Sequence, residues 1–252
     1  MRVLIVSRVA WNSSTNFGST YSSFFGGMED VEIAHVYFGS GKPDTIIAKA
    51  FFRVTEKDVL DSLLKRKKEC GQRVFCTEKS EVVEKNRFQE STVRSIILYL
   101  GRDLLFRTGV WKTKDLEQFI QDFSPDIVFT PIYGYLYMHW IERYIKKIAN
   151  CPMISFVSDD NYSLKQFNLS PMYWIYRFLL RSEVRKTVKA GDGLFTISEL
   201  QRRELSSRSR GYLSRWSFMC LPLFVQSKNL VKRTGAKQTA TTRSLTSVVC
   251  GD

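Results

Sequence analysis

The sequence predicts an α/β protein with a doubly wound, mostly parallel Rossmann-like sheet. Short apolar runs rich in β-branched residues recur along the chain, and longer stretches with helical apolar spacing separate them. About six strands and as many helices alternate over roughly the first 200 residues, as in parallel sheets built from βαβ units. The 252 residues are 44% hydrophobic, which is enough for one large domain or two small ones.

The first half of the chain opens with the apolar run "RVLIVS", a strand buried on both faces. A helix is expected to begin near Gly18 or Ser19. A further helix follows Thr55 and has acidic residues early and basic residues late, which matches the helix dipole. Residues 72–92 are expected to form a loop. The remaining predicted elements are strands over 31–38 and 49–54 and a helix over 91–111.

The second half repeats the alternation. Thr113 is a candidate cap for a helix over 114–123. Pro171 near the start and Gly191 at the end frame a long helix. Ser198 followed by Gln201 fits a capping box. The other predicted elements are strands over 124–131, 152–158 and 193–197 and a helix over 135–149.

Ligands bind parallel sheets at the carboxyl ends of the strands, so the loops after residues 7, 130, 157 and 197 are the candidate site. The first loop leads to Gly18 and Ser19, where backbone N–H groups at a helix start can approach an anion. The segment is neither GxGxxG nor a P-loop. The alternative is that Gly18 and Ser19 only begin the helix.

The loop after residue 130 carries Tyr133, Gly134 and Tyr135. Gly134 allows a tight turn, and the two tyrosines can stack on a sugar face or donate hydrogen bonds. His139 lies further along the following helix, where a packed or surface residue is a commoner outcome than a catalytic base.

Two adjacent carboxylates, Asp159 and Asp160, directly follow the strand "MISFV". Such carboxylates can accept a hydroxyl proton or fix the hydroxyls of a sugar, with Asp159 as the candidate catalytic residue. The alternative is a solvated loop that caps the next element. No second acidic cluster completes a metal site. Ser198 is expected to be a helix cap first, with ligand contact as a secondary role.

The net charge of +13 is unevenly distributed. Residues 205–252 contain eight basic residues and one acidic residue, whereas residues 1–204 contain 30 basic and 24 acidic residues. Two helices combine arginine with aromatic residues, one around Arg102 and one with a stripe of Arg177, Arg181 and Arg185, which fits either an anionic lipid surface or a solvated helix face. Nothing beyond charge indicates nucleic acid. Five cysteines without a CxxC pair, and no signal or spanning segment, favour a cytoplasmic protein.

Five segments resemble the N-terminal domain of bacterial GT-B glycosyltransferases of the group-1, family-4 type. They are "MRVLIVSRVAW", "NFGSTYSSFFGGM", "SPDIVFTPIYGY", "MISFVSDDNYSLKQF" and "GDGLFTISELQRRE". The resemblance spans residues 1–204 and implies an acceptor-side lobe that faces a donor-binding lobe. It places Gly18 and Ser19 near the donor phosphates and Asp159 toward the acceptor. Tyr133 and Gly134 stand where many members have a functional His.

The family resemblance also implies the partners. It implies a nucleotide-sugar donor, a glycan or lipid-linked acceptor, no metal or other cofactor, and location on the inner face of the cell membrane. Residues 205–252 do not continue the family pattern, so we expect an irregular basic tail of frameshifted or disordered sequence. A chain with one lobe is expected to be inactive alone. The alternative is a non-catalytic binding subunit whose donor domain is a separate chain.

Overall fold

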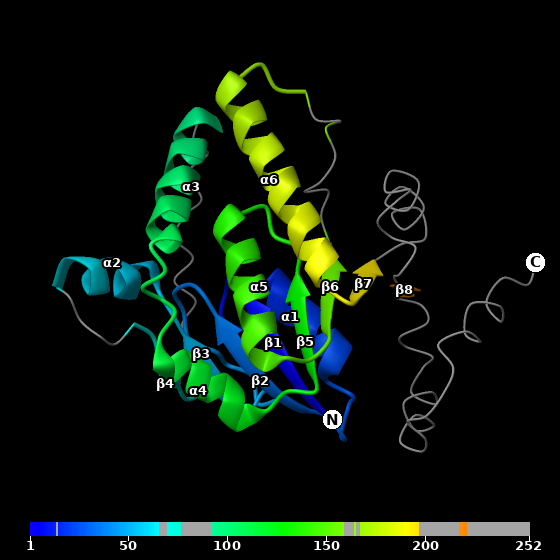
Figure 1. The fold of residues 1–252 in the computed structure, drawn as a ribbon. Coiled ribbons are helices and arrows are strands. Elements are labelled where there is room, and N and C mark those ends of the chain that lie inside the picture. The colour runs from blue at the N-terminus through cyan, green and yellow to red at the C-terminus, as the bar shows by residue number, and fades with distance from the viewer. Residues whose placement is uncertain are drawn as a thin grey trace, which may run out of the picture.

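The structure, a computed structural model, describes residues 1–13, 15–65, 70–76, 92–158, 164, 167–196 and 217–220. Side chains are described in all of these ranges except at residues 92–97, 196 and 217–220. The described ranges contain one eight-stranded sheet and six helices (Figure 1). The predicted α/β class is confirmed.

The sheet has the strand order β4-β3-β2-β1-β5-β6-β7-β8, with β1 near its centre. All neighbouring strands are parallel except β3 and β4, which are antiparallel. The strands are β1 (Arg2–Ser7), β2 (Glu32–Tyr37), β3 (Ala50–Arg53), β4 (Gln72–Val74), β5 (Ile127–Pro131), β6 (Met153–Val157), β7 (Gly193–Thr196) and β8 (Ser217–Cys220). The central strands are buried along almost their whole length, as expected for a sheet covered on both faces.

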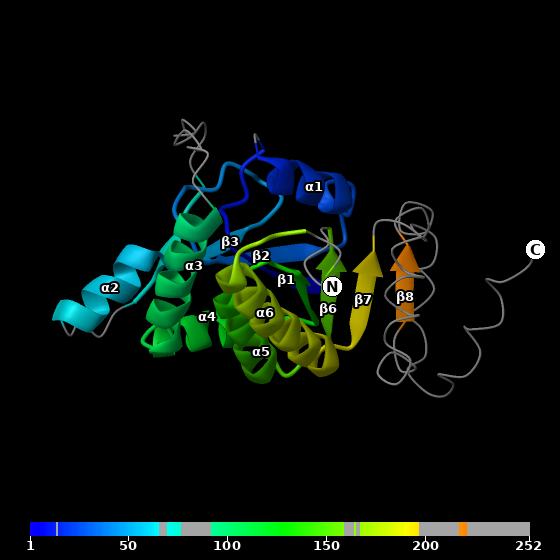
Figure 2. The ribbon, with the colours of Figure 1, turned by 90° about the horizontal axis from the view of Figure 1, so that it is seen from above.

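Helices cover both faces of this sheet. They are α1 (Asn16–Phe25), α2 (Glu56–Lys65), α3 (Thr92–Arg107), α4 (Lys114–Phe123), α5 (Leu136–Ala149) and α6 (Pro171–Ala190). Seen from above, α1 lies on one side of the sheet and α4, α5 and α6 lie on the other (Figure 2). This two-sided arrangement makes the sheet doubly wound, as the sequence predicts.

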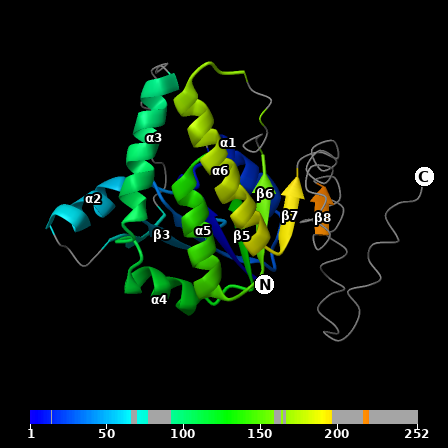
Figure 3. The same ribbon diagram turned by 45° about the horizontal axis from the view of Figure 1, so that its top comes forward.

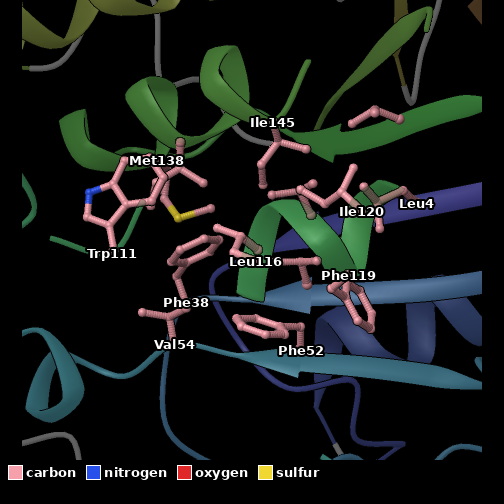
Figure 4. Packing of buried hydrophobic residues seen from close by; sticks show 14 of the residues in the cluster. Leu4, Phe38, Phe52, Val54, Trp111, Leu116, Phe119, Ile120, Met138 and Ile145 are labelled. Atoms are coloured by element: carbon pink, nitrogen blue, oxygen red, sulfur yellow. The ribbon is translucent and has the colours of Figure 1, made fainter. Parts of the chain in front are cut away.

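The larger core lies between the sheet and the helices α4 and α5 (Figure 4). Leu116, Phe119 and Ile120 occupy one face of α4 because positions three and four apart lie on the same side of a helix. They pack in one cluster with Leu4 of β1 and Phe52 of β3. Each such side chain contributes about 1.5–3 kcal/mol when fully buried, so this contact fixes α4 against the sheet.

The opposite core is dominated by aromatic residues beneath α1. Tyr21 and Phe25 of this helix pack on Trp11 and on Phe129 of β5. The Trp11 indole N–H donates a hydrogen bond to the Ser22 hydroxyl at 3.1 Å. A single helix therefore covers the centre of this face by means of large side chains.

Three boundaries differ from the sequence prediction. Helix α1 begins at Asn16, before the predicted Gly18, because the Thr15 hydroxyl caps it. Strand β4 lies within the predicted loop 72–92, and β8 lies within the predicted irregular tail 205–252. Both are short strands defined by pairing with β3 and β7, and their own residue patterns are too brief to predict them. The rest of the tail is outside the described residues, and the predicted domain boundary at residue 204 stays a prediction.

Helices α3 and α6 lie side by side and extend beyond the sheet (Figures 1 and 3). The rings of Tyr99 on α3 and Tyr176 on α6 are 6.2 Å apart between centroids. In Figure 1 the arrowheads of β5 and β7 point toward the same end of the molecule as the upper parts of these helices. The two helices therefore flank the carboxyl edge of the sheet.

Candidate functional site

The carboxyl edge of the sheet brings together the loops after β1 and β5. These two strands are parallel neighbours, so both chains leave the sheet at the same edge. Arg8 directly follows β1, and its backbone N–H donates to the Tyr133 hydroxyl in the loop after β5 at 3.2 Å. This hydrogen bond joins two loops that are 125 residues apart in the sequence.

Two guanidinium groups lie against the ring of Tyr135. The Arg8 Cζ atom is 4.6 Å from the ring centroid, and the Arg102 Cζ atom of α3 is 5.8 Å from it. Arginine stacks favourably on an aromatic face through cation–π attraction. Tyr99 contacts the same ring edge-on, with the centroids 5.2 Å apart. The Tyr135 ring therefore contacts two guanidinium groups, one from the loop after β1 and one from α3.

The two arginines differ in how their charge is balanced. Arg102 forms an ion pair with Glu56 at the start of α2. Arg8 is half-buried, and no carboxylate within the described ranges forms an ion pair with it. Burial lowers the pKa of Arg8, but the neighbouring Tyr135, Tyr137 and Tyr133 outweigh this and raise it above its ordinary value. Arg8 is thus a fixed cation at the edge of the sheet.

A buried carboxyl group, Asp103, lies beside this cluster. Its Oδ1 accepts a hydrogen bond from the backbone N–H of Tyr137 in the first turn of α5 at 2.9 Å. The residue is only 3% exposed, and no group in the part of the chain that the structure describes forms a hydrogen bond with its Oδ2 atom. Burial raises the pKa of Asp103 to about 6, against lowering contributions from the Tyr137 N–H and from Tyr176. Asp103 therefore joins α3 to the start of α5 and titrates near neutral pH.

His139 and Glu142 form a fully buried pair on α5. The Nε2 atom of His139 is 3.0 Å from the Tyr133 carbonyl oxygen, and its Nδ1 atom is 3.2 Å from a carboxyl oxygen of Glu142. Because a carbonyl oxygen only accepts, Nε2 must carry a proton. Both side chains are completely inaccessible to solvent. His139 therefore supports the Tyr133 loop from inside, in line with the packed residue that the sequence favours.

The start of α1 places Gly18 and Ser19 differently from the sequence expectation. The Gly18 N–H donates to the Thr15 hydroxyl at 3.1 Å, and the Ser19 N–H donates to the Thr15 carbonyl at 2.9 Å. Gly18 is buried against the preceding loop, where an added Cβ would lie 1.8 Å from the Asn12 carbonyl oxygen. Glycine is thus required for close packing, and both amides already take part in the helix cap. Contact of these residues with donor phosphate stays a prediction.

Tyr133 and Gly134 also have structural partners. Tyr133 is 5% exposed, and its ring packs on Phe17 with centroids 5.7 Å apart. Burial raises the pKa of its hydroxyl to about 12. The Gly134 carbonyl accepts a hydrogen bond from the Tyr176 hydroxyl at 3.4 Å. The more accessible aromatic residue of this loop is the half-buried Tyr135.

Three residues that the sequence indicates as site residues, Asp159, Asp160 and Ser198, lie outside the described residues. The strands that lead to them are described, and β6 and β7 end at the same edge as β5. Their predicted roles in catalysis and substrate binding stay predictions.

The remaining histidine, His35, is part of the core. Its Nε2 atom lies 2.7 Å from the Ser7 hydroxyl, which itself donates to the Val9 carbonyl at 2.6 Å. The Ser7 oxygen therefore accepts from Nε2–H. Burial lowers the pKa of His35 to about 3, so the ring is neutral at ordinary pH. Ser7 and His35 thus anchor the end of β1, directly before Arg8.

Arg8 and Asp103 are not among the site residues that the sequence pattern indicates. Arg8 could have been found, because it is the first residue after the central strand in a loop that was already selected. Asp103 carried no signal, because a single acidic residue within an amphipathic helix is usually solvated. Within the ranges that the structure describes, no three His, Cys, Asp or Glu residues cluster in a way that could hold a metal ion.

No protein-family model and no curated protein matches the sequence. Solved structures of plant UDP-glycosyltransferases resemble the chain. UGT73P12 from Glycyrrhiza uralensis, complexed with glycyrrhetinic acid 3-O-monoglucuronide, has 10% identity and a TM-score of 0.41, covering 86% of this chain and 48% of the other. UGT89C1 from Arabidopsis thaliana, complexed with UDP, has 12% identity and a TM-score of 0.42, and the match covers 90% of this chain and 56% of UGT89C1. Apo UGT2 from Phytolacca americana has 9% identity and a TM-score of 0.43, and the match covers 94% of this chain and 55% of UGT2. The chain spans about half the length of these proteins.

Proposed function

We propose that residues 1–204 form the acceptor-side lobe of a glycosyltransferase that uses a nucleotide-sugar donor. The observation that carries the proposal is the convergence of the GT-B-like segments at one edge of the sheet. The segments that contain β1, β5, β6 and β7 are adjacent and parallel, so their loops leave the sheet on the same side. In an open parallel sheet this edge is where ligands bind.

The proposed acceptor is a surface polysaccharide precursor or a lipid-linked glycan. Asp159, after β6, is proposed to contact the reacting hydroxyl as its base, with Asp160 and Ser198 as further contacts. Transfer then needs a donor-binding lobe, supplied by further sequence or by a separate chain. The proposal includes no metal, because a helix dipole and basic side chains can stabilise a leaving diphosphate.

A binding and a turnover measurement together test this function. Saturation-transfer NMR with glycan acceptors should show contact that is weakened in Asp159→Asn and unchanged in Asp115→Asn. Asp115 is a matched control because it is an exposed acid in the first turn of α4. Donor hydrolysis and transfer by the purified chain should stay at background. Turnover well above background would contradict the one-lobe proposal, and the absence of any acceptor contact would contradict the acceptor-side assignment.

We also propose that the protein works at the inner face of the cell membrane, with contact through the outward face of α6. None of the helices in the described ranges has the length and apolar character that a bilayer crossing requires. The first half of α6 exposes Ile175, Phe178 and Leu179, which are 56%, 56% and 48% accessible. Exposed basic residues follow on the same helix, including Arg185 and Lys189, whereas Arg177 of the predicted stripe is only 7% exposed and does not belong to this surface. Apolar side chains beside basic ones favour binding to an anionic lipid surface.

Vesicle co-sedimentation tests the membrane contact. The full chain should bind vesicles that contain phosphatidylglycerol more strongly than vesicles of phosphatidylcholine alone. Phe178→Ser should weaken this binding about tenfold, because one large apolar side chain contributes roughly 1.5–3 kcal/mol when buried. Leu64→Ser on α2 is the matched control, since Leu64 is 73% exposed on a different helix. Equal loss in both variants, or no loss in Phe178→Ser, would refute the assignment to α6.

A further inference from the structure

Arg8 is a charged group that forms no ion pair with any carboxylate in the described ranges. A guanidinium group stays protonated at all ordinary pH values, so Arg8 cannot become neutral when it is partly buried. Buried charges in proteins are normally paired with an opposite charge, and a half-buried charge such as that of Arg8 loses part of its hydration. Within the described ranges, the groups around Arg8 are the side chains of Tyr133, Tyr135 and Tyr137 and the Arg102 guanidinium, which lies over the same Tyr135 ring. Among the described residues, Arg8 is therefore a positive charge without a carboxylate partner at the carboxyl edge of the sheet.

Two carboxylates near this cluster have partners other than Arg8. Glu56 pairs with Arg102, and Asp103 accepts the backbone N–H of Tyr137 at the start of α5. Arg102 adds a second cation against the same tyrosine ring, and none of the described residues forms a hydrogen bond with its Nη1 atom. Two guanidinium groups thus share one aromatic ring, and within the described ranges Arg102 has a carboxylate partner whereas Arg8 has none.

The geometry points to a phosphate-binding site formed by Arg8, with Arg102 as a second cation and Tyr135 as the ring that holds both. A guanidinium group presents paired N–H donors that match two phosphate oxygens. Arg8 follows the central strand, at the edge where ligands of such sheets bind. This inference rests on the proposed function, because it identifies a phosphate as the substrate group bound at that same site. The phosphate belongs either to a nucleoside diphosphate or to an isoprenoid-linked acceptor.

Isothermal titration with inorganic pyrophosphate tests the site directly in the full chain. Arg8→Gln should lower the affinity about tenfold to a hundredfold, since a hydrogen bond to a charged group contributes roughly 1.5–3 kcal/mol. Arg102→Gln should weaken binding to a smaller extent, because Glu56 already balances part of its charge. Arg8→Lys keeps the charge and loses the paired donors, so its affinity should lie between those of the wild type and Arg8→Gln.

Two arginines serve as matched controls. Arg2 lies at the opposite end of β1, and Arg107 lies in the last turn of α3 beyond Arg102. Arg2→Gln and Arg107→Gln remove the same charge and should retain wild-type affinity. Circular dichroism of each variant verifies its fold. If Arg8→Gln folds, wild-type affinity in this variant would overturn the inference. If Arg8→Gln does not fold, Arg8→Lys takes its place, and wild-type affinity in Arg8→Lys would overturn the inference. An equal loss in Arg2→Gln would also overturn it.

Two further ligands identify the source of the phosphate. If UDP binds more tightly than pyrophosphate and its binding depends on Arg8, the site belongs to the donor. If farnesyl diphosphate binds more tightly than pyrophosphate and its binding depends on Arg8, the site belongs to a lipid-linked acceptor. Pyrophosphate binding requires no sugar transfer, so this test is separate from that of the proposed function. Arg8-dependent binding without acceptor contact would leave the phosphate site in place and remove the acceptor-side proposal.

Discussion

Replacement of Asp103 by asparagine should stabilise the protein above pH 7. Asparagine keeps an oxygen that can accept the Tyr137 backbone N–H, and it removes a charge from a side chain that is 3% exposed. Burial raises the pKa of Asp103 from 3.8 to about 6. The folded state therefore binds the proton more tightly than the unfolded state does. The stabilising contribution of this group is complete below pH 3.8 and is lost as the pH rises through about 6.

The size of the effect follows from the same two pKa values. A pKa change from 3.8 to about 6 corresponds to about 3 kcal/mol of unfolding free energy, at 1.36 kcal/mol for each pH unit. At pH 8 we expect Asp103→Asn to be more stable than the wild type by roughly 1–3 kcal/mol, because the amide hydrogen bond is weaker than that of a carboxylate. Below pH 4 the two proteins should be nearly equal in stability.

Urea denaturation followed by circular dichroism between pH 4 and 8 measures the difference. The difference between variant and wild type is the useful quantity, because other groups titrate in both proteins. Asp115→Asn, which removes an exposed charge from the first turn of α4, is the control and should not be stabilised relative to the wild type at pH 8. If Asp103→Asn is less stable than the wild type at pH 8, or if the difference does not change with pH, the reasoning about the buried carboxylate fails.

Three other substitutions have defined outcomes. Gly18→Ala should lower the unfolding free energy measured in urea by about 1–3 kcal/mol, because the added Cβ would lie 1.8 Å from the Asn12 carbonyl oxygen. Ser19→Ala changes an exposed neighbour and is the control. Thr113→Ala should lower the unfolding free energy by about 1 kcal/mol, because the Thr113 hydroxyl accepts the Leu116 N–H at the start of α4. Thr113→Ser keeps a hydroxyl and should lose less, so equal losses in the two variants would argue against the cap. His35→Gln should reduce acid sensitivity, because a pKa lowered from 6.5 to about 3 costs up to roughly 5 kcal/mol as the pH falls through that range. A wild-type acid transition in His35→Gln would contradict this.

The predictions that agree best with the structure depend on neighbours in the sequence. Thr113 caps α4 by accepting the N–H of Leu116, and Thr55 and Asp58 exchange hydrogen bonds at the start of α2. These contacts join residues three positions apart, so the local pattern contains both partners. The start of α1 was predicted late because Asn16 and Phe17 resemble loop residues, although Thr15 supplies the cap.

The candidate site depended on contacts between distant residues. Arg8 and Arg102 both reach the Tyr135 ring because β1 and β5 are neighbours and α3 packs against α5. The carboxyl group of Asp103 becomes buried through contact with α5, 34 residues away. No periodicity in the sequence predicts such partners.

The sequence by itself determined the alternation of strands and helices, the parallel sheet and the edge at which ligands are expected. Apolar periodicity and capping act over a few residues, so the local sequence contains the information that specifies them. The tertiary structure decided which charges lack partners, which carboxyl group is buried and which glycine is needed for close packing. These properties depend on dielectric surroundings and distances that exist only after strands far apart in the chain have come together.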